Sequence, residues 1–362
     1  MNQNELHLLD SYIAENLSFA IYRLPGEDVL HLLVQDTDSP THLNTINELN
    51  GQSGFVISPF TVSSECPIIL LHPTRKADIP FPQKEGKSHP GKKREESHPG
   101  EEYAARFATF IAPIRQKEFK KLVLSRSLTV GKSTSFSPSM AFLLACSKYT
   151  RSYVYLLHTP RTGTWLGSTP EMLLCGTGNI WNTVSIAGTQ VLRNGELPQT
   201  WDDKNLIEQM LVSYYIRTQL TSFGIHPSEK GPYTVRAGEL AHLRTDFHFS
   251  LPNASQLGDL LKLLHPTPAV SGLPKEEAYR FILDNEGYCR RYYSGFIGLL
   301  EPEGKSDLYV NLRCMNIHDN SFTLYAGGGL LPSSVLEQEW QETEDKLQTM
   351  LYLTQVNNYV FE

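Results

Sequence analysis

The sequence predicts an α+β fold, with large antiparallel sheets packed against flanking helices. Predicted strands and helices come in runs along the chain, which disfavours the strict alternation of a doubly wound parallel sheet. The 362 residues are 40% hydrophobic and 20% charged, as in an ordinary globular protein. A chain of this length buries about three quarters of its unfolded surface, so its core needs no disulfide or metal for stability.

The first 102 residues are predicted to form an N-terminal α+β part of the same fold. A short helix precedes strands that continue to about residue 80, and segments 18–24 and 29–34 flank a Pro-Gly-Glu-Asp turn typical of a hairpin. Residues 84–102 are rich in Lys, Glu, Gly, Pro and Ser and contain Ser-His-Pro-Gly twice. Because this composition cannot support a core, we expect a flexible loop there.

Residues 103–362 are predicted to form the catalytic region. Helices are expected at 103–119, 140–146, 204–220, 257–264 and 276–286. Strands are expected at 121–130, 153–157, 163–167, 184–190, 293–300, 308–317 and 322–326, and segment 169–174 is expected to follow a Gly-Ser turn. The apolar stripe of helix 204–220 is expected to consist of Leu206, Met210, Leu211 and Tyr214.

A run of three glycines at 327–329 precedes the last predicted helix. Consecutive glycines can take positive φ and expose backbone N–H groups to a ligand. Ser334 and Glu337 have the spacing of a capping box, so a helix is expected to start there. On that helix Glu339, Glu342 and Lys346 share one face, which predicts two carboxylates and an ammonium directed at one place.

Charge and cysteine content narrow the classes of function. The net charge is -7 and there is no long basic run, which argues against a nucleic-acid or anionic-membrane partner. Five scattered cysteines, with no C-x-x-C, favour a reducing compartment. The N-terminus has no signal-peptide pattern, and no apolar run approaches the ~18 residues of a membrane span, so we expect a cytoplasmic protein.

The predicted helices bring together carboxylates that suit a hard divalent cation. Glu208 lies on helix 204–220, and Glu339 and Glu342 lie on the last helix. Mg²⁺ is commonly held by one or two protein carboxylates, with water and substrate completing its coordination. Neither group contains histidine or cysteine, which disfavours zinc.

Several separate motifs occur in order through residues 103–357. They are Lys-Leu-Val-Leu-Ser-Arg at 121–126, Gly-Ser-Thr-Pro-Glu at 167–171, Ile-Ala-Gly-Thr at 186–189, Lys-x-x-x-Glu at 204–208, Leu-His-Pro-Thr-Pro-Ala-Val-Ser-Gly at 264–272, Arg-x-x-Tyr-x-Gly at 290–295, Leu-Arg at 312–313, and the stretch 327–346.

In these motifs and their spacing the chain resembles the chorismate-utilising enzymes, and within them the isochorismate synthases. The resemblance implies the fold that this family shares with aminodeoxychorismate synthase. It also implies Mg²⁺-dependent conversion of chorismate to isochorismate, with a water-derived hydroxyl added at C2 and the C4 hydroxyl lost. The product would serve menaquinone or siderophore biosynthesis, and the sequence does not decide between them.

The resemblance assigns catalytic and metal-binding roles. Lys121 would be the general base that activates water, and Glu171 would protonate the leaving hydroxyl. A basic lysine needs burial or a cationic neighbour, and a protonated carboxylic acid needs an apolar pocket. Glu208 and Glu342 would bind Mg²⁺, and Glu339 would act through water or as an outer ligand.

The resemblance also assigns the substrate contacts. Arg313 suits a carboxylate because its guanidinium is a planar fork, and Tyr293 would donate a further hydrogen bond. The remaining contacts would come from Gly188, Thr189, His242, Ala269, Gly327, Gly329 and Lys346. For His242, Ala269 and Tyr293, simple packing is an equally plain interpretation of the sequence.

Two positions separate the branches of the family. Lys121 occupies the position where the anthranilate-forming members of the family have a glutamine. Ala187 occupies the position where aminodeoxychorismate synthases have a nucleophilic lysine. Both favour water as the nucleophile. Three residues depart from the family pattern: Asn205 replaces an acidic residue, Gln209 replaces a histidine and Cys289 replaces an aspartate.

Two alternative functions are a salicylate synthase and a non-catalytic relative that binds chorismate. We expect a monomer or a weak homo-oligomer.

Overall fold

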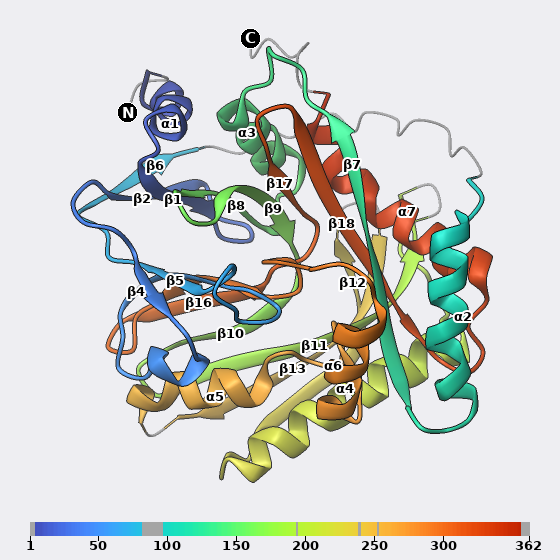
Figure 1. Cartoon of the computed structure of the whole chain (residues 1–362). Coiled ribbons are helices and arrows are strands. Elements are labelled where there is room, and N and C mark those ends of the chain that lie inside the picture. The colour runs from blue at the N-terminus through green and yellow to red at the C-terminus, as the bar shows by residue number, and fades with distance from the viewer. Residues whose placement is uncertain (1–3, 82–96, 193–194, 238–239, 252, 356–362) are drawn as a thin grey trace.

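A computed structural model describes residues 4–81, 97–192, 195–237, 240–251 and 253–355. Within these residues two nine-stranded sheets pack face to face, and helices cover their outer faces (Figure 1). Every strand pair is antiparallel. The predicted α+β class with large antiparallel sheets is confirmed.

The first sheet contains the longest strand pair, which carries the glycine run. Its spatial order is β14 (Gly272–Leu273), β7 (Lys121–Gly131), β18 (Ser321–Leu330), β17 (Cys314–Ile317), β9 (Gly163–Thr169), β8 (Tyr153–Thr159), β1 (Ser18–Arg23), β2 (Val29–Gln35) and β6 (Arg75–Pro80).

The second sheet faces the first and is likewise built from both ends of the chain. Its order is β12 (Ser228–Ala237), β13 (Leu240–Ser250), β11 (Ile180–Val191), β10 (Met172–Thr177), β16 (Lys305–Val310), β15 (Phe296–Leu300), β4 (Gly54–Ser58), β5 (Ile68–Leu71) and β3 (Thr41–Leu43).

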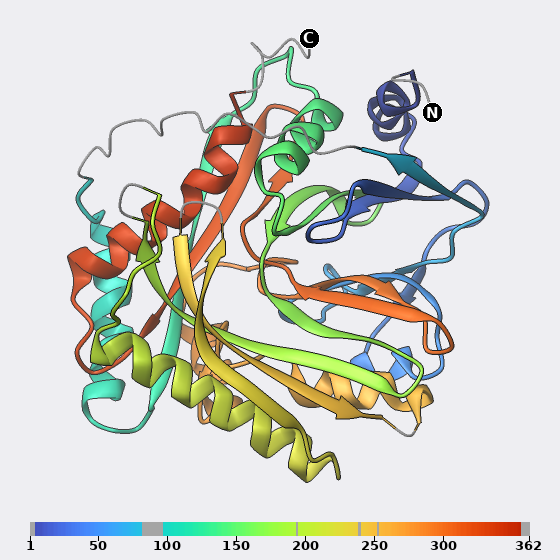
Figure 2. The same cartoon turned by 180° about the vertical axis from the view of Figure 1, so that it is seen from behind.

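Helices lie on the outer faces of both sheets, as the two opposite views show (Figures 1 and 2). They are α1 (Asn4–Ala14), α2 (Glu101–Arg115), α3 (Pro138–Lys148), α4 (Asp203–Ser222), α5 (Leu257–Leu264), α6 (Lys275–Asn285) and α7 (Leu336–Leu353), with short 3-10 turns at Ile46–Leu49 and Ala254–Gln256. Helices α2 and α7 lie beside β7 and β18, and α4 lies against β11 and β13.

Strand alternation explains how the layers hold together. In β1, Phe19 and Ile21 join the core under α1, α3 and α7, whereas Ala20 and Tyr22 join the aromatic core between the sheets. Because both faces of β1 are covered, every residue of the strand is buried, and residues 19–22 are apolar in succession instead of at every second position. A further core, under α4 and α5, covers the outer face of the second sheet.

The hairpin at the N-terminus is confirmed, since β1 and β2 pair directly. Two predicted strand boundaries were wrong, and both lie where the chain crosses between sheets. Gly167 and Ser168 form no turn but continue β9, and the chain leaves that sheet at Pro170 and Glu171. The expected strand 308–317 is two strands, β16 and β17, in different sheets.

The expected features around the glycine run were also partly wrong. Residues 327–329 do not take positive φ, because they continue β18 and pair with β7. The capping box is absent from the described helix α7: Val335 is its N-cap and makes no side-chain bond there, and Ser334 Oγ instead accepts a hydrogen bond from Leu331 N at 3.0 Å. Helix α2 starts at Glu101, and residues 84–96 of the expected loop lie outside the described residues.

The apolar stripe predicted for α4 was wrong as a buried face. Leu206, Met210 and Tyr214 are 42%, 60% and 60% exposed. The first turns of the helix instead bury Glu208 with polar neighbours that bond β11 and β13. Its buried apolar residues are Val212, Tyr215, Ile216 and Leu220, further along the helix. Gln209 Nε2 donates to Ser185 Oγ at 2.8 Å, so hydrogen bonds fix this face of the helix against the sheet.

Candidate active site

The predicted site residues come together around one cavity between the two sheets. Lys121 and Glu339 lie just behind its wall. The cavity is lined by Val123, Pro170, Glu171, Ile186, Ala187, Gly188, Thr189, Glu208, His242, Ala269, Val270, Tyr293, Leu312, Arg313, Tyr325, Ala326, Gly327, Gly329, Glu342 and Lys346.

The glycine run leaves the space that functional side chains occupy. A Cβ at Gly329 would lie 2.1 Å from Glu208 Oε1 and 2.7 Å from Lys121 Cε. At Gly328, on the other face of the strand, it would lie 3.1 Å from Glu339 Oε2. Within β18, only residues 322–324 pair with β17, so the edge of the glycine run opposite β7 has no strand partner there, and side chains from α4 and α7 meet around it. The glycines serve close approach and not an unusual φ.

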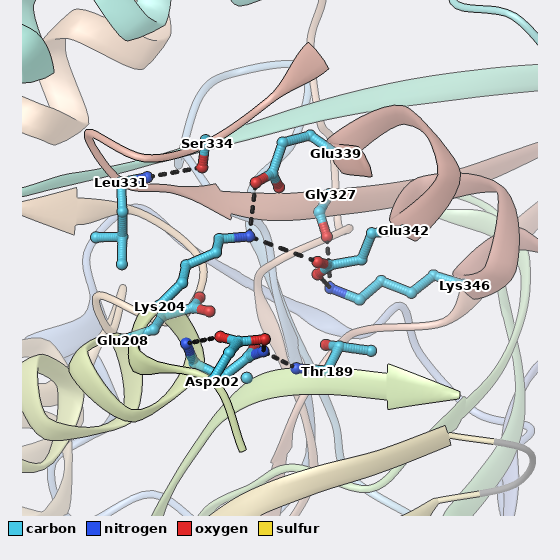
Figure 3. Close-up of polar contacts among 12 residues, drawn as sticks. Thr189, Asp202, Lys204, Glu208, Gly327, Leu331, Ser334, Glu339, Glu342 and Lys346 are labelled. Carbon is cyan, nitrogen blue, oxygen red and sulfur yellow. Dashed lines mark hydrogen bonds and ion pairs between the residues drawn. The ribbon is translucent and has the colours of Figure 1, made fainter. Parts of the chain in front are cut away.

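Three carboxylates around this strand each face a lysine. Figure 3 shows the two pairs that involve the glutamates of α7. Glu208 Oε1 lies 2.9 Å from Lys121 Nζ, and Glu342 Oε1 lies 2.8 Å from Lys346 Nζ. Lys346 also donates to Gly327 O at 2.8 Å. The predicted shared face of α7 is therefore present, and its polar groups point to β18.

The third pair was not predicted as functional. Lys204, from the first turn of α4, donates to Glu339 Oε1 at 2.6 Å and lies 4.0 Å from Glu342 Oε2. Burial would lower the pKa of Lys204, but Glu342, Glu339 and Glu208 together raise it, so the ammonium stays charged. The sequence signal was available, because Lys204 opens the Lys-x-x-x-Glu motif that contains Glu208.

The two glutamates of α7 differ in their electrostatic surroundings. Burial and the neighbouring charge of Glu342 raise the pKa of Glu339 to about 7, against the opposing effect of Lys204. For Glu342 burial also acts upward, but Lys346 and Lys204 outweigh it and lower the pKa to about 2. Glu342 is therefore the firmly ionised member of the pair.

The proposed base and acid are both buried. Lys121 is 0% exposed and Glu171 is 5% exposed. Burial raises the pKa of Glu171 to about 7, although Lys121, Lys346 and Arg313 act in the opposite direction. Glu171 follows the crossover from β9 to β10, where its backbone O accepts from Val310 N at 2.9 Å. A protonated carboxyl group near neutral pH can donate a proton to a leaving group.

Arg313 lies in the second crossover, between β16 and β17, and has a φ of 46°. Its guanidinium donates to Nε2 of His242. His242 Nδ1 in turn donates to Gly188 O at 2.8 Å, and this pair of contacts fixes the imidazole tautomer. Burial, Arg313 and Lys346 lower the pKa of His242 to about 3, so the ring is neutral. Burial lowers the pKa of Arg313 to about 10, which leaves it cationic.

Gly188 and Thr189 form a bulge in β11, where the register with β13 shifts. Gly188 has a φ of 73°, and a Cβ there would lie 3.1 Å from Asn205. Asn205 Oδ1 accepts from Thr189 N at 3.0 Å, and its Nδ2 donates to Asp202, the N-cap of α4. Asn205 thus fixes the bulge to the helix, which explains one departure from the family pattern.

Tyr293 and Ala269 also line the cavity. The Tyr293 ring stacks on Tyr325, with centroids 5.3 Å apart, and burial raises its pKa, so its phenol remains a donor. The segment containing Ala269 is fixed by Arg290, which donates to Val270 O at 2.7 Å. Cys289, another departure from the pattern, is exposed and accepts from Arg291 N.

The carboxylates fit a hard divalent cation by their chemistry. Glu208, Glu339 and Glu342 supply only oxygen donors, as Mg²⁺ requires. Glu339 Oε2 is buried and makes no hydrogen bond of ordinary geometry to the described residues. The Lys204 ammonium lies between the carboxylates of Glu339 and Glu342. In the described part of the chain, no three His, Cys, Asp or Glu side chains are grouped closely enough to hold a metal ion.

Comparison with known proteins identifies the family. The family model described as "Chorismate binding enzyme" matches residues 71–355. The chain belongs to the chorismate binding enzymes. The match starts before residue 103, where the sequence motifs begin, and includes β6. No helix among the described residues has the length and apolar character needed to cross a membrane.

Two curated relatives of this chorismate binding enzyme are isochorismate synthases of Escherichia coli. EntC is 29% identical over 69% of this chain, and MenF is 33% identical over 66% of it. The matched parts span 66% of EntC and 58% of MenF, less than two thirds of either relative. The solved structure of MenF, at 22% identity, has a TM-score of 0.79 and covers 98% of this chain and 91% of that chain. It therefore shares the fold.

Proposed function

We propose that this chorismate binding enzyme is an isochorismate synthase. The observation that carries the proposal is the arrangement around one cavity of a buried carboxyl group, Glu171, with a pKa of about 7 and a separate lysine–carboxylate cluster. A reaction that exchanges a hydroxyl group requires an acid for the leaving group and a base for the incoming water. The family supplies the substrate, chorismate, whose two carboxylates suit the cationic groups Arg313 and Lys346.

In the proposed reaction, water attacks C2 of chorismate and gives a proton to Lys121. The ring double bonds shift, and the C4 hydroxyl leaves as water with the proton of Glu171. Water is consumed and released in equal amounts, so the reaction is an isomerisation. Lys121 can accept the proton only as a neutral amine, so substrate binding must draw Glu208 away from the ammonium that it now contacts at 2.9 Å.

Arg313 and Tyr293 would hold one substrate carboxylate, and Lys346 with the backbone of Gly327 and Gly329 would hold the other. His242 acts through Arg313 by fixing the guanidinium from behind. Glu208 and Glu342, with Glu339 beside them, would hold Mg²⁺. When bound, this ion would supply Lewis-acid polarisation of the substrate and charge balance for its carboxylate.

Water as the nucleophile follows from two residues. Lys121 and not glutamine occupies the base position, and Ala187 lies in the cavity wall where a nucleophilic lysine would otherwise project. The small apolar pair Ala269 and Val270 favours release of isochorismate over its further conversion to salicylate. The product could serve a menaquinone or a siderophore pathway.

The test is to incubate the purified chain with chorismate and Mg²⁺ and to separate the products by chromatography. We expect isochorismate in a reversible mixture with chorismate. Formation of salicylate and pyruvate at the rate of chorismate loss would instead identify a salicylate synthase. Chorismate that binds without any turnover would identify a non-catalytic relative.

A further inference from the structure

Lys204 lies where α4 and α7 approach each other across the glycine strand. Its ammonium donates to Glu339 Oε1 at 2.6 Å and lies 4.0 Å from Glu342 Oε2. Figure 3 shows this ammonium between the two glutamates of α7, with Glu208 on its other side. The proposed function does not use this residue as a catalyst or as a substrate contact.

The three lysines of the cluster differ in what else holds them. Lys121 is completely buried, and Lys346 is anchored by the carbonyl of Gly327 and by Glu342 on its own helix. Lys204 comes from a different helix, and the contacts described for its ammonium are all with the α7 carboxylates. Its side chain is 20% exposed, so it has a route to solvent that Lys121 lacks.

The same carboxylates are the candidate ligands of the divalent cation. Glu339 and Glu342 are three residues apart on one helix, and two buried like charges at that spacing repel each other. A nearby positive charge relieves this repulsion, and an ammonium and a metal ion can both supply it. The two cations cannot occupy the same carboxylate oxygens together, because their charges also repel.

We infer that Lys204 is an internal cation that takes the place of the divalent cation in the empty enzyme and withdraws from Glu339 and Glu342 when the divalent cation binds. This inference rests on the proposed function for the identity of the site. Lys204 is then a positioning residue. Between turnovers its charge holds the side chains of Glu339 and Glu342 in place and offsets their negative charges. Mg²⁺ should therefore bind more weakly than the carboxylates alone would allow.

Calorimetric titration with MgCl₂, in the absence of chorismate, tests the energetic part. Lys204→Met should bind Mg²⁺ ~10-fold or more tightly than the wild type, because a competing charge a few ångströms away is removed. Lys204→Arg should bind no more tightly than the wild type, since the guanidinium keeps the charge. Lys262→Met, which makes the same change on the exposed side of α5, is the matched control and should bind as the wild type does.

Amine labelling followed by peptide mass spectrometry tests the movement itself. In the wild type, the labelling rate of Lys204 should rise as MgCl₂ is added, with a midpoint equal to the calorimetric Kd, and that of Lys262 should stay constant. If Lys204→Met binds Mg²⁺ more tightly but the labelling rate of Lys204 in the wild type does not change with MgCl₂, Lys204 repels the cation without moving. That result would overturn the proposed withdrawal of Lys204. Unchanged or weaker binding by Lys204→Met would overturn the inference altogether.

The thermal unfolding of the same variants separates misfolding from a real effect. Without Mg²⁺, Lys204→Met should unfold at a lower temperature than the wild type, and saturating MgCl₂ should raise its midpoint more than that of the wild type. An equal rise in both proteins would contradict the inference. If chorismate turnover needs no divalent cation, the metal part of the proposed function fails, which the activity assay reports independently of these measurements.

Discussion

Glu171 and Lys121 carry the two proton transfers of the proposed reaction. Both roles were inferred from the resemblance to the family. The structure buries Lys121 completely, because the glycine at 329 lets the chain of Lys121 and the Glu208 carboxylate pack over bare backbone. Burial of this kind depends on residues far apart in the sequence, so no local pattern predicts it.

Replacement of Glu171 by glutamine should remove the acid without removing the side chain. We expect kcat to fall by ~10²–10⁴-fold, the usual contribution of a positioned acid. In the wild type, kcat/KM should fall as pH rises through about 7, because Glu171 then loses its proton. A full pH profile of wild type and Glu171→Gln checks this. Persistence of the same alkaline limb in Glu171→Gln would assign it to another group.

The raised pKa of Glu171 also has a consequence for stability. The folded protein holds this proton up to about pH 7, whereas the unfolded chain releases it near 4.5. The contribution of Glu171 to stability is therefore fully present below about pH 4.5 and is lost as pH rises to about 7. At pH 8, Glu171→Gln should unfold at a higher temperature than the wild type, as measured by calorimetry. A lower midpoint would contradict the assigned burial cost.

Lys121→Gln should test the base. The variant removes an ammonium that contacts Glu208, so binding of chorismate should survive while most of kcat is lost, again by ~10²–10⁴-fold. Steady-state kinetics together with equilibrium binding of chorismate separate the two effects. An unchanged kcat would remove Lys121 from the mechanism.

Among the helices and strands, β18 and α4 show what sequence patterns can and cannot predict. The existence of α4 was predicted correctly, but its buried face was not, because the inward side carries Glu208 and Gln209 instead of Leu206 and Met210. Hydrophobic periodicity assumes that a helix buries apolar residues. In the first turns of α4, hydrogen bonds to β11 and β13 stabilise a polar inner surface that carries Glu208, and the apolar part of the buried face lies further along, at Val212, Tyr215, Ile216 and Leu220.

The glycine run also served a different purpose from the one predicted. Loop-like φ angles were expected, whereas the structure uses the absence of a Cβ in a regular strand. Likewise, the segment 308–317 is mostly apolar, and its pattern does not mark the crossover at Arg313 that splits it between two sheets. The resemblance to the family identified the motif residues. Their backbone conformation and the strand to which each belongs are set by tertiary packing.

Gly329→Ala tests this account of β18. The new Cβ would collide with Glu208 and Lys121, so we expect the fold to persist while kcat/KM falls by roughly 10²-fold through misplaced groups. Gly131→Ala, in β7, is the matched control, since its Cβ would meet nothing within 4 Å. Circular dichroism reports the fold and product formation reports activity. Equal activity in both variants would show that Gly329 is not required for close approach.

At the scale of the whole molecule, the site depends on the two sheets being held face to face. β7 and β18 belong to one sheet, β11 and β13 to the other, and the two crossovers between them carry Glu171 and Arg313. The sequence predicted the fold class and assembled the site residues by resemblance, but not this pairing of crossovers. The division of the chain at residue 102 stays a prediction, although residues 18–80 contribute strands to both sheets.

Charge balance across the cavity predicts a dependence on divalent cations. Chelation should abolish turnover, and Glu208→Gln or Glu342→Gln should each weaken Mg²⁺ binding and reduce turnover severely, because each removes one charged donor from a site with few. Titration of activity with MgCl₂ and calorimetry of Mg²⁺ binding provide the measurements. Wild-type activity of either variant at limiting Mg²⁺ would show that the substituted residue is not a ligand.

Turnover of chorismate in water enriched in heavy oxygen tests the central claim most directly. If water attacks C2 and the C4 hydroxyl departs, mass spectrometry of the isolated isochorismate will show one heavy oxygen atom, located in the C2 hydroxyl. Lys121→Gln serves as the control. We expect labelled isochorismate from the wild type and none from this variant. Isochorismate that forms without heavy oxygen, or chorismate that remains unconverted with Mg²⁺ present, would contradict the account.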